Sequence, residues 1–473
     1  HNLLHCAVAL ASFTGLAGAQ GLGARITPLI PGIDSLAAAE FAKDSLGSIT
    51  VGVVAGAELV WTHSYGFADM KSRRVADRNT VYRIGSITKP FTAVMLMQLL
   101  NEGKIRLSDP VEKYFPEIKQ VGGMSPGAPP VTFLQLATMT AGLAREPREE
   151  GPFWTGPVAR WEQTLISALP HTSYESFPGT RFSYSNVGYA ILGAELGRVA
   201  NESYVNWERA RVLEPLGMTR TRFEIDASIA ANVAKGYLVT RDGSLDGDTP
   251  AKEARDGRGY KVPNGAIFTT VDDLSRFVAF ELGHGSASVL PPARLDTAFS
   301  GFVASSADMS SGYGLGFMAM RRGAFTYVGH SGAVAGYGAA MYFNRAAQVG
   351  VVVFHNVSGG REDPDGLAVD ILSRLVDENK QHRVVSVDPK IFDGYVGRYE
   401  FRPNLIMAVT REGNQLFTQA TGQRRIEVFP EGERDFFVKA FDAQLTFETD
   451  ARGRATAIIL HQGGATLRAK RIE

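Results

Sequence analysis

The sequence predicts an α+β domain that is followed by a small antiparallel β-barrel. Strand-like runs occur at residues 49–66 and return at residues 325–356, with helical and loop segments between them. After about residue 385 the pattern changes to short strand-like runs alone. A chain of 473 residues is also long for one domain, since domains average about 150 residues. We therefore expect one domain over residues 20–380 and a second over residues 385–473.

The first domain is expected to begin with a strand pair and a buried helix. Residues 49–66, ITVGVVAGAELVWTHSYG, are typical of two strands around an AGAE turn. The helix that follows contains Ser86 and Lys89, is apolar nearly all round and should end near Gly103. Residues 104–320 then mix short helices with loops rich in glycine and proline.

The end of the first domain and the whole second domain are predicted from shorter signals. Residues 325–356 contain three strand-like runs, and residues 364–378 show helical spacing with proline at the first helical position. A polar stretch, residues 377–383, leads into the second domain. Eight short strand-like runs follow, punctuated mostly by Gly, Asp or Asn, and this spacing predicts a small antiparallel barrel or sandwich.

Composition excludes several classes of partner. Formal net charge is zero and there is no block of Lys or Arg, so we expect neither nucleic acid nor an anionic membrane surface as partner. After the N-terminal stretch no run reaches about 18 apolar residues, the length that a transmembrane helix needs. The expected partner is a small molecule.

Residues 1–19 resemble a secretory signal. The run is apolar and ends in Ala17-Gly18-Ala19, which favours cleavage before Gln20 and a secreted or periplasmic protein. A short buried helix is the alternative. The single cysteine, Cys6, lies in this segment, so its removal would exclude thiol catalysis and zinc-thiolate sites. The nine histidines show no close metal-ligand spacing, and no metal or cofactor is expected.

The first candidate for chemistry is Ser86-Ile87-Thr88-Lys89. Residues three apart on a helix share a face, so the hydroxyl and the amine should meet. A serine needs a base, and lysine can serve as one only when it is neutral. Burial beside an apolar helix lowers the pKa of lysine. The alternative is a helix-capping serine followed by a surface lysine.

The second candidate is Tyr184-Ser185-Asn186, between a Pro-Gly turn and an apolar helical run. A phenol can relay protons, and an amide two residues on can contact a lysine or a substrate carbonyl. The same Tyr-x-Asn pattern recurs at residues 204–206 and 342–344, which are expected to lie in a helix and a strand. We interpret those two copies as structural.

The third candidate is His330-Ser331-Gly332, at the end of a strand-like run. Small residues let the backbone of a strand approach a ligand closely. The alternatives are a glycine-rich hairpin and a Ser/His/Asp site, the latter of which would leave Lys89 unexplained. The G-x-S-x-G match at residues 123–127 is discounted because Pro126 has no N–H for an oxyanion hole.

Together and in this order, the three motifs resemble those of the serine β-lactamase and penicillin-binding-protein-like hydrolases. The tyrosine in the second motif resembles the branch with class C β-lactamases, family VIII carboxylesterases and D-aminopeptidases. The resemblance covers about residues 35–380 and includes LSDPVEKYFP, FLQLATMTAGL, PNGAIFTTVDDLSRF and GYGLGF. It implies an antiparallel sheet flanked by helices plus an all-helical region. Residues from about 385 onward resemble a lipocalin-like domain.

The resemblance also implies roles for the site residues. Ser86 would be the nucleophile, Lys89 and Tyr184 its base system, and Asn186 would orient Lys89 and the substrate. The N–H groups of Ser86 and Ala333 would form the oxyanion hole. The remaining substrate-binding residues are His330, Ser331 and Gly332. Since histidine replaces the usual lysine of the third motif and is mostly neutral at pH 7, strong β-lactamase activity is not expected.

The expected function is hydrolysis of small esters or amides through an acyl-enzyme, most like a carboxylesterase. A D-aminopeptidase, a DD-peptidase or a weak β-lactamase would use the same chemistry on a peptide or lactam. A protein of another class, which keeps the fold for binding or assembly without turnover, is also considered. In either case the C-terminal domain could mediate a homo-oligomer.

Overall fold

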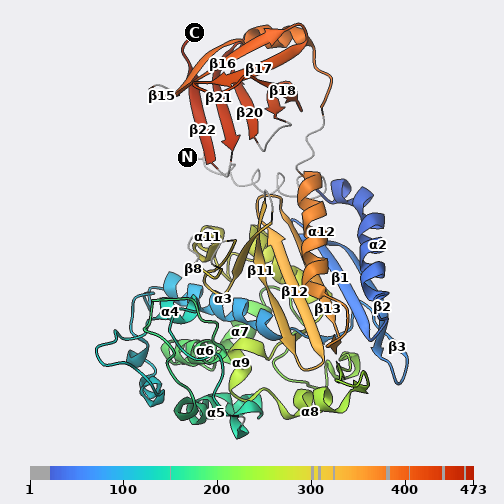
Figure 1. Cartoon of the computed structure of the whole chain (residues 1–473), viewed down its shortest axis with the longest axis vertical. Coiled ribbons are helices and arrows are strands. Elements are labelled where there is room, and N and C mark those ends of the chain that lie inside the picture. The colour runs from blue at the N-terminus through green and yellow to red at the C-terminus, as the bar shows by residue number, and fades with distance from the viewer. Residues whose placement is uncertain are drawn as a thin grey trace, which may run out of the picture. The chain divides into compact units, whose positions relative to one another are not determined.

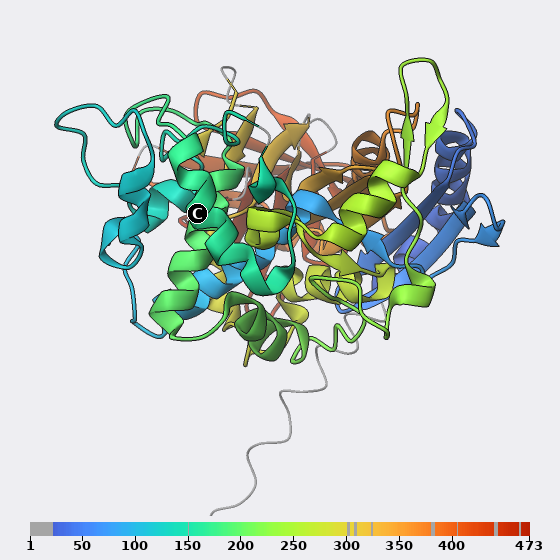
Figure 2. The same cartoon turned by 90° about the horizontal axis from the view of Figure 1, so that it is seen from below.

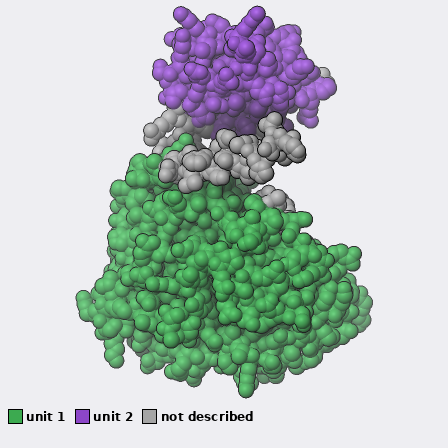
Figure 3. Space-filling model, turned by 180° about the vertical axis from the view of Figure 1, so that it is seen from behind, with its two compact units in different colours: residues 1–378 green, residues 379–473 purple. Residues whose placement is uncertain are grey.

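The structure is a computed structural model. It describes residues 22–149, 151–299, 303–306, 310–322, 325–379, 384–403, 405–438, 443–462 and 465–473. The chain divides into two compact units, residues 1–378 and 379–473 (Figure 3). The expected signal segment and Cys6 lie outside the described residues, so export stays a prediction. In the part of the chain that is described, no helix combines the length and apolarity needed to cross a bilayer.

Unit 1 is built on an antiparallel sheet, in which nine strands of the described chain pair (Figure 1). In spatial order the strands are β3 (Arg74–Val75), β2 (Glu58–Asp69), β1 (Ser48–Ala55), β13 (Val349–His355), β12 (Tyr337–Asn344), β11 (Phe325–Val334), β10 (Met318–Arg322), β9 (Ser311–Tyr313) and β8 (Val303–Ala304). The N-terminal strand pair therefore joins the C-terminal strands through β1 and β13. The predicted strands at residues 49–66 and 325–356 are confirmed.

Both faces of this sheet are covered by helices. One face packs against α2 (Ile30–Phe41) and α12 (Pro364–Asn379), and the other against α10 (Val271–Ala279). On β13, Val351 and Val353 pack in the core with α2 and α12, whereas Val352 and Phe354 pack in the core with α10. A strand buried on both faces is apolar at every position, which explains the run VGVVVFH.

A helical region lies to one side of the sheet, coloured from blue-cyan to yellow-green in Figures 1 and 2. Its helices are α3 (Thr88–Asn101), α4 (Phe133–Ala137), α5 (Trp161–Ala168), α6 (Asn186–Ala200), α7 (Tyr204–Glu208), α8 (Asp248–Asp256), α9 (Val262–Gly265) and α11 (Pro292–Phe299). Helix α3 is the central one, and all but its last two residues are buried. This arrangement confirms the predicted α+β class with an all-helical region.

In the described part of unit 1, two small sheets lie outside the nine-stranded one. Strands β4 (Tyr82–Arg83) and β7 (Phe268–Thr269) pair with each other just before α3 and α10 begin. Strand β5 (Tyr237–Val239) pairs with β6 (Leu245–Asp246) and with β14 (Val357–Ser358). Because β4 is fixed in this way, the turn that carries Ser86 is held at its N-terminal side.

Unit 2 is a closed antiparallel barrel of eight strands in the described chain. The strands are β15 (Gly397–Arg402), β16 (Leu405–Glu412), β17 (Gln415–Ala420), β18 (Ile426–Pro430), β19 (Asp435–Phe437), β20 (Ala443–Thr449), β21 (Ala455–Gln462) and β22 (Ala465–Arg471). Pairing of β15 with β22 closes the barrel, and its core contains Tyr399 and Phe447. The predicted barrel is confirmed, while its lipocalin-like character and its role in oligomerisation stay predictions.

Glu281, in the one-turn extension of α10, has a measurable consequence for stability. Its carboxylate is fully buried without a hydrogen-bond partner among the described residues, and burial raises its pKa from 4.5 to about 8. Between these two pH values the folded state binds the proton that the unfolded state has released. The free energy of unfolding should therefore fall as pH rises, by about 1.4 kcal/mol per pH unit for this group.

We expect Glu281→Gln to weaken this pH dependence, because the amide cannot ionise. Melting temperatures at pH 5 and pH 8 test it, and the variant should lose less stability between them than the unaltered protein. Glu58→Gln, at an exposed carboxylate, is the matched control. An unchanged pH dependence in Glu281→Gln would contradict the assignment.

Candidate active site

Ser86 lies in a single 3-10 turn, Gly85–Ile87, directly before α3. The sequence predicted this serine at the start of the helix, and the structure places it in the turn just outside the α-helical part. Gly85 has a φ of +50°, a value that favours glycine, and a side chain there would approach Ala333 N to 2.8 Å. The turn therefore presents Ser86 against the backbone of β11.

Lys89 is fully buried, and its amine faces Ser86. Its Nζ lies 3.0 Å from Ser86 Oγ, 2.8 Å from Asn186 Oδ1 and 3.2 Å from the Asn264 carbonyl. Burial lowers the pKa of Lys89 well below its usual 10.5, and the nearby cations Arg145, Arg258 and Lys261 lower it further. A neutral amine can donate to Asn186 and Asn264 and keep its lone pair for the proton of Ser86.

The second motif lies at the start of α6. Ser185 caps this helix by accepting a hydrogen bond from Gly188 N at 2.9 Å, and Asn186 is the first helical residue. The ring of Tyr184 lies 4.7 Å from Lys89 Nζ. Burial raises the pKa of Tyr184 above its usual 10, although a hydrogen bond with Ser86 opposes this. The phenol is therefore protonated at neutral pH.

The third motif lies on β11, just beyond the part of the strand that pairs with β10. Pairing between the two strands stops at Gly329, which leaves the following residues without a partner on that side in the described sheet. The ring of His330 points toward Tyr313, whose hydroxyl lies 3.0 Å from Nε2. Ser331, the next residue of the strand, alternates to the opposite face, beside Tyr342 and Asp365, whose side chains are hydrogen-bonded to each other at 2.8 Å.

His330 is held as a neutral ring. It is 2% exposed, its Nδ1 is hydrogen-bonded with the Ser331 carbonyl, and its pKa is lowered to about 3 by burial and by Lys89. With both ring nitrogens engaged and no carboxylate hydrogen-bonded to it in the described chain, it cannot act as the base of a Ser/His/Asp site without breaking these contacts.

Gly332 allows β11 to approach the turn that carries Ser86. A Cβ at this position would lie 1.9 Å from the Ile84 carbonyl oxygen and 2.9 Å from Ser86 N. Because a Cβ at Gly85 would likewise meet Ala333 N, the backbone N–H groups of Ser86 and Ala333 lie on facing segments. Two such donors are what an oxyanion requires.

A pocket of about 240 Å³ opens at Ser86. It is lined by Gly85, Ser86, Arg145, Glu146, Asn186, Arg258, Lys261, Asn264, Gly265, Ala333, Val334 and Ala335. A second pocket also includes Ser86, but it continues along Tyr184, His330 and Ser331. Among the described residues, no group of three or more His, Cys, Asp or Glu side chains is placed to hold a metal ion.

Comparison with protein families agrees with this geometry. The model described as Beta-lactamase matches residues 33–374, and the model described as Domain of unknown function (DUF3471) matches residues 381–471. The chain belongs to the beta-lactamase family. The predicted resemblance to serine β-lactamases and penicillin-binding proteins is thereby confirmed.

Individual relatives show how far the likeness extends. Penicillin-binding protein 4* of Bacillus subtilis (strain 168) is 24% identical over 445 residues, which are 88% of this chain and 93% of the relative. The octameric penicillin-binding protein homologue from Pyrococcus abyssi shares the fold with a TM-score of 0.63 and 23% identity, over 93% of this chain and 100% of that one. A D-stereospecific amidohydrolase from Streptomyces sp. does so with a TM-score of 0.59 and 21% identity, over 72% and 98%.

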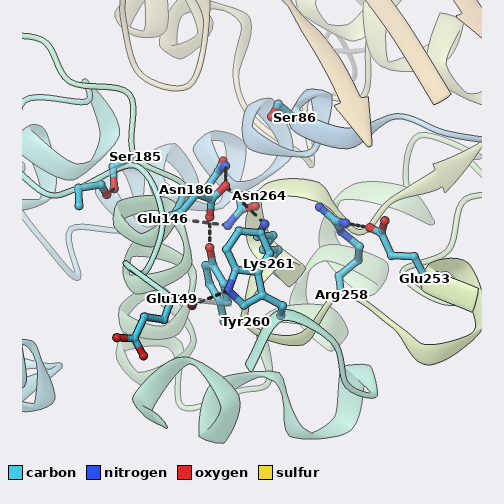
Figure 4. A network of polar contacts seen from close by, with 12 residues as sticks. Ser86, Glu146, Glu149, Ser185, Asn186, Glu253, Arg258, Tyr260, Lys261 and Asn264 are labelled. Atoms are coloured by element: carbon cyan, nitrogen blue, oxygen red, sulfur yellow. Dashed lines mark hydrogen bonds and ion pairs between the residues drawn. The ribbon is translucent and has the colours of Figure 1, made fainter. Parts of the chain in front are cut away.

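Sequence reasoning missed a polar network behind Asn186, which Figure 4 shows in this beta-lactamase-family site. Glu146 accepts a hydrogen bond from Asn186 Nδ2 at 2.6 Å and another from the Tyr260 hydroxyl, and it lies 3.4 Å from Lys261 Nζ. Asn264 Nδ2 donates to the Asn186 carbonyl at 2.8 Å. The network therefore holds Asn186, which in turn holds Lys89.

The signals that could have found these residues are weak. Arg145 and Glu146 directly follow TAGLA, and Tyr260, Lys261 and Asn264 lie in GYKVPNG. The first stretch follows FLQLATMTAGL and the second overlaps PNGAIFTTVDDLSRF, both quoted above, yet neither has a spacing that indicates chemistry. The recurring Tyr-x-Asn copies fall in α7 and β12, and Ser125 of the discounted G-x-S-x-G match is exposed in a loop.

Glu146 also acts on Lys89 through its charge, which raises the pKa of the amine. We expect Glu146→Gln, which keeps an oxygen for Asn186, to lower the pKa of Lys89 further. The acid side of the pH profile of kcat/KM should then move to lower pH. The measurement is that profile for a small ester, and a shift to higher pH would show that the charge of Glu146 does not act in this way.

Proposed function

We propose that the chain is a carboxylesterase-like serine hydrolase that acts on small esters or amides. The observation that carries the proposal is the fully buried Lys89 amine, 3.0 Å from Ser86 Oγ and with a pKa well below its usual value. Burial disfavours the charged form of such an amine, and the neutral form can accept the serine proton. A capping serine with a surface lysine would have neither the burial nor the contact.

Acylation follows from this arrangement. Ser86 Oγ attacks the substrate carbonyl while its proton passes to Lys89 Nζ, and the negative charge on the carbonyl oxygen faces the N–H groups of Ser86 and Ala333. The bond between the carbonyl carbon and the leaving group then breaks. Tyr184, which is protonated, gives its proton to the leaving group and recovers one from Lys89.

Deacylation repeats these steps with water. The oxygen of water bonds to the acyl carbon while the base system of Lys89 and Tyr184 takes one proton from it. The bond between the acyl carbon and Ser86 Oγ then breaks, and that proton passes to Ser86 Oγ. The carboxylic acid is released. These steps use no cofactor, because the acyl group passes from the substrate to Ser86 and then to water without any change of oxidation state.

The third motif favours esters and amides over β-lactams. His330 takes the place of a lysine that would supply a positive charge for a lactam carboxylate, and its ring is neutral and buried behind Tyr313. The third motif therefore supplies no positive charge for binding the carboxylate of a β-lactam. We therefore rank a small-ester or amide hydrolase above a β-lactamase.

The test combines labelling with a substrate panel. A fluorophosphonate should add one adduct to the protein by intact-mass spectrometry, and the adduct should be absent in Ser86→Ala. The protein should hydrolyse p-nitrophenyl esters faster than D-aminoacyl anilides or nitrocefin. Labelling without ester hydrolysis, or nitrocefin turnover far above the esters, would overturn the substrate assignment, and absence of the adduct would favour a binding protein without turnover.

A further inference from the structure

The pocket at Ser86 carries an excess of positive charge. Its lining includes three cationic side chains, Arg145, Arg258 and Lys261, and one carboxylate, Glu146. Lys261 is 6% exposed and Arg258 is partly buried, so these charges are poorly screened by solvent. Its apolar walls are limited to small side chains of the segment after Gly332.

The cations differ in how fully they are paired. Glu146 is occupied by Asn186, Tyr260 and Lys261, as described above. Arg258 shares the single carboxylate of Glu253 with the buried Arg83, so one carboxylate serves two guanidinium groups. Figure 4 shows Arg258 directed to Glu253 at one side of the network.

Arg145 is the cation that is left for a ligand. Its guanidinium lies over the ring of Tyr184, 4.8 Å from the centroid, and makes no hydrogen bond or ion pair within the described part of the chain. The residue is exposed and lines both pockets that meet at Ser86. A planar guanidinium in such a position can bind a carboxylate through two hydrogen bonds.

The geometry also indicates which half of the substrate enters this pocket. Tyr184, the proposed proton donor to the leaving group, lines the second pocket and not the first. The leaving group therefore belongs beside Tyr184 and His330. The acyl group, which stays on Ser86, belongs in the cationic pocket beside Asn186.

We propose that the preferred acyl group is short and carries a terminal carboxylate, bound by Arg145 with Arg258 and Lys261 nearby. This inference rests on the proposed function and specifies its substrate class as monoesters or monoamides of dicarboxylic acids. A long alkyl chain would find few apolar contacts here. An acyl group with a free ammonium, such as an unblocked amino acid, would be repelled by the same cations.

Three p-nitrophenyl esters of similar acyl length test the proposal, with the uncatalysed rate subtracted. They are the hydrogen adipate, the neutral hexanoate and the 5-(trimethylammonio)pentanoate. We expect kcat/KM to be about tenfold or more higher for the adipate than for the hexanoate, as one charge-assisted hydrogen-bonded pair provides. The cationic ester should be the poorest, and added salt should reduce the differences.

A matched pair of variants assigns the preference to the pocket. Arg145→Gln should reduce the ratio of adipate to hexanoate toward one. Arg148→Gln changes an exposed arginine three residues further along the chain, which lines neither pocket, and should keep the ratio of the unaltered protein. An equal preference for adipate and hexanoate, or a ratio that Arg145→Gln does not change, would overturn the proposal.

A binding measurement separates this inference from the proposed function. In Ser86→Ala, calorimetry compares adipamate, which has a distal carboxylate, with hexanamide, which has none. Tighter binding of adipamate that Arg145→Gln abolishes supports the anionic pocket even if no ester is turned over. Equal binding overturns it, even if the protein hydrolyses esters and so fulfils the proposed function.

Discussion

Lys89→Ala is expected to lower kcat/KM for a p-nitrophenyl ester by about 10³-fold or more, since it removes the base and leaves Ser86 Oγ unactivated. The amine lies 3.0 Å from that oxygen, and among the described residues Ser86 has no other nitrogen base in hydrogen-bond contact. Lys89→Met, which fills more of the buried space, should lose as much activity. Agreement of the two variants would separate loss of the base from a packing defect.

The role of Lys89 as the base also predicts the direction in which activity changes with pH. Because burial and the cations around it lower the pKa of Lys89, the base is lost only when pH falls through that lowered value. The activity of the unaltered protein should therefore decline on the acid side well below the usual lysine pKa of 10.5. The residual activity of Lys89→Ala should lack this limb.

Controls keep the result interpretable. Lys71→Ala removes an exposed lysine and should leave kcat/KM unchanged. Circular dichroism should show that each variant is folded. Near-normal turnover in a folded Lys89→Ala protein would refute the mechanism, and it would restore a Ser/His/Asp site as the simplest alternative.

Gly332→Ala is the second change for which we expect a large loss. The added Cβ would lie 1.9 Å from the Ile84 carbonyl oxygen and 2.9 Å from Ser86 N, and both are backbone atoms that cannot rotate away. Either β11 or the turn with Ser86 has to move. Each movement separates the N–H of Ala333 from that of Ser86, and loss of an oxyanion donor costs about 10²–10³-fold in kcat.

The matched control is Gly122→Ala, where the nearest atom would lie 3.7 Å from the new Cβ. Kinetics on one ester and a thermal melt should be recorded for both variants. Gly332→Ala should lose kcat far more than KM changes, because the donors act on the transition state. Activity within a factor of about two of the unaltered protein would mean that the backbone donors are not where we place them.

Much of the fold could be predicted from local patterns. The alternating and fully apolar runs became β1, β2, β11, β12 and β13, and the eight short runs after residue 385 became the barrel strands. Helix α12 was predicted from its spacing and its proline, although it extends to Asn379, into the polar stretch that was assigned as a linker. Helix α3 was predicted as well, but the glycine before Ser86 placed the serine in a separate turn.

The chain alone determined the pair Ser86 and Lys89, because residues three apart must share one face of the turn where α3 begins. Local spacing likewise placed Tyr184 and Asn186 in one motif, and His330 and Gly332 in another. The amine's surroundings were decided only by tertiary structure: Asn186 lies 97 residues from Lys89, and Asn264 lies 175 residues away. Arg145 and Glu146 reach the site from one loop, and Arg258 reaches it from another, after α8. Burial and charge depend on everything that surrounds a group in space, so no short stretch of sequence contains the lowered pKa of Lys89 or the cationic wall of its pocket.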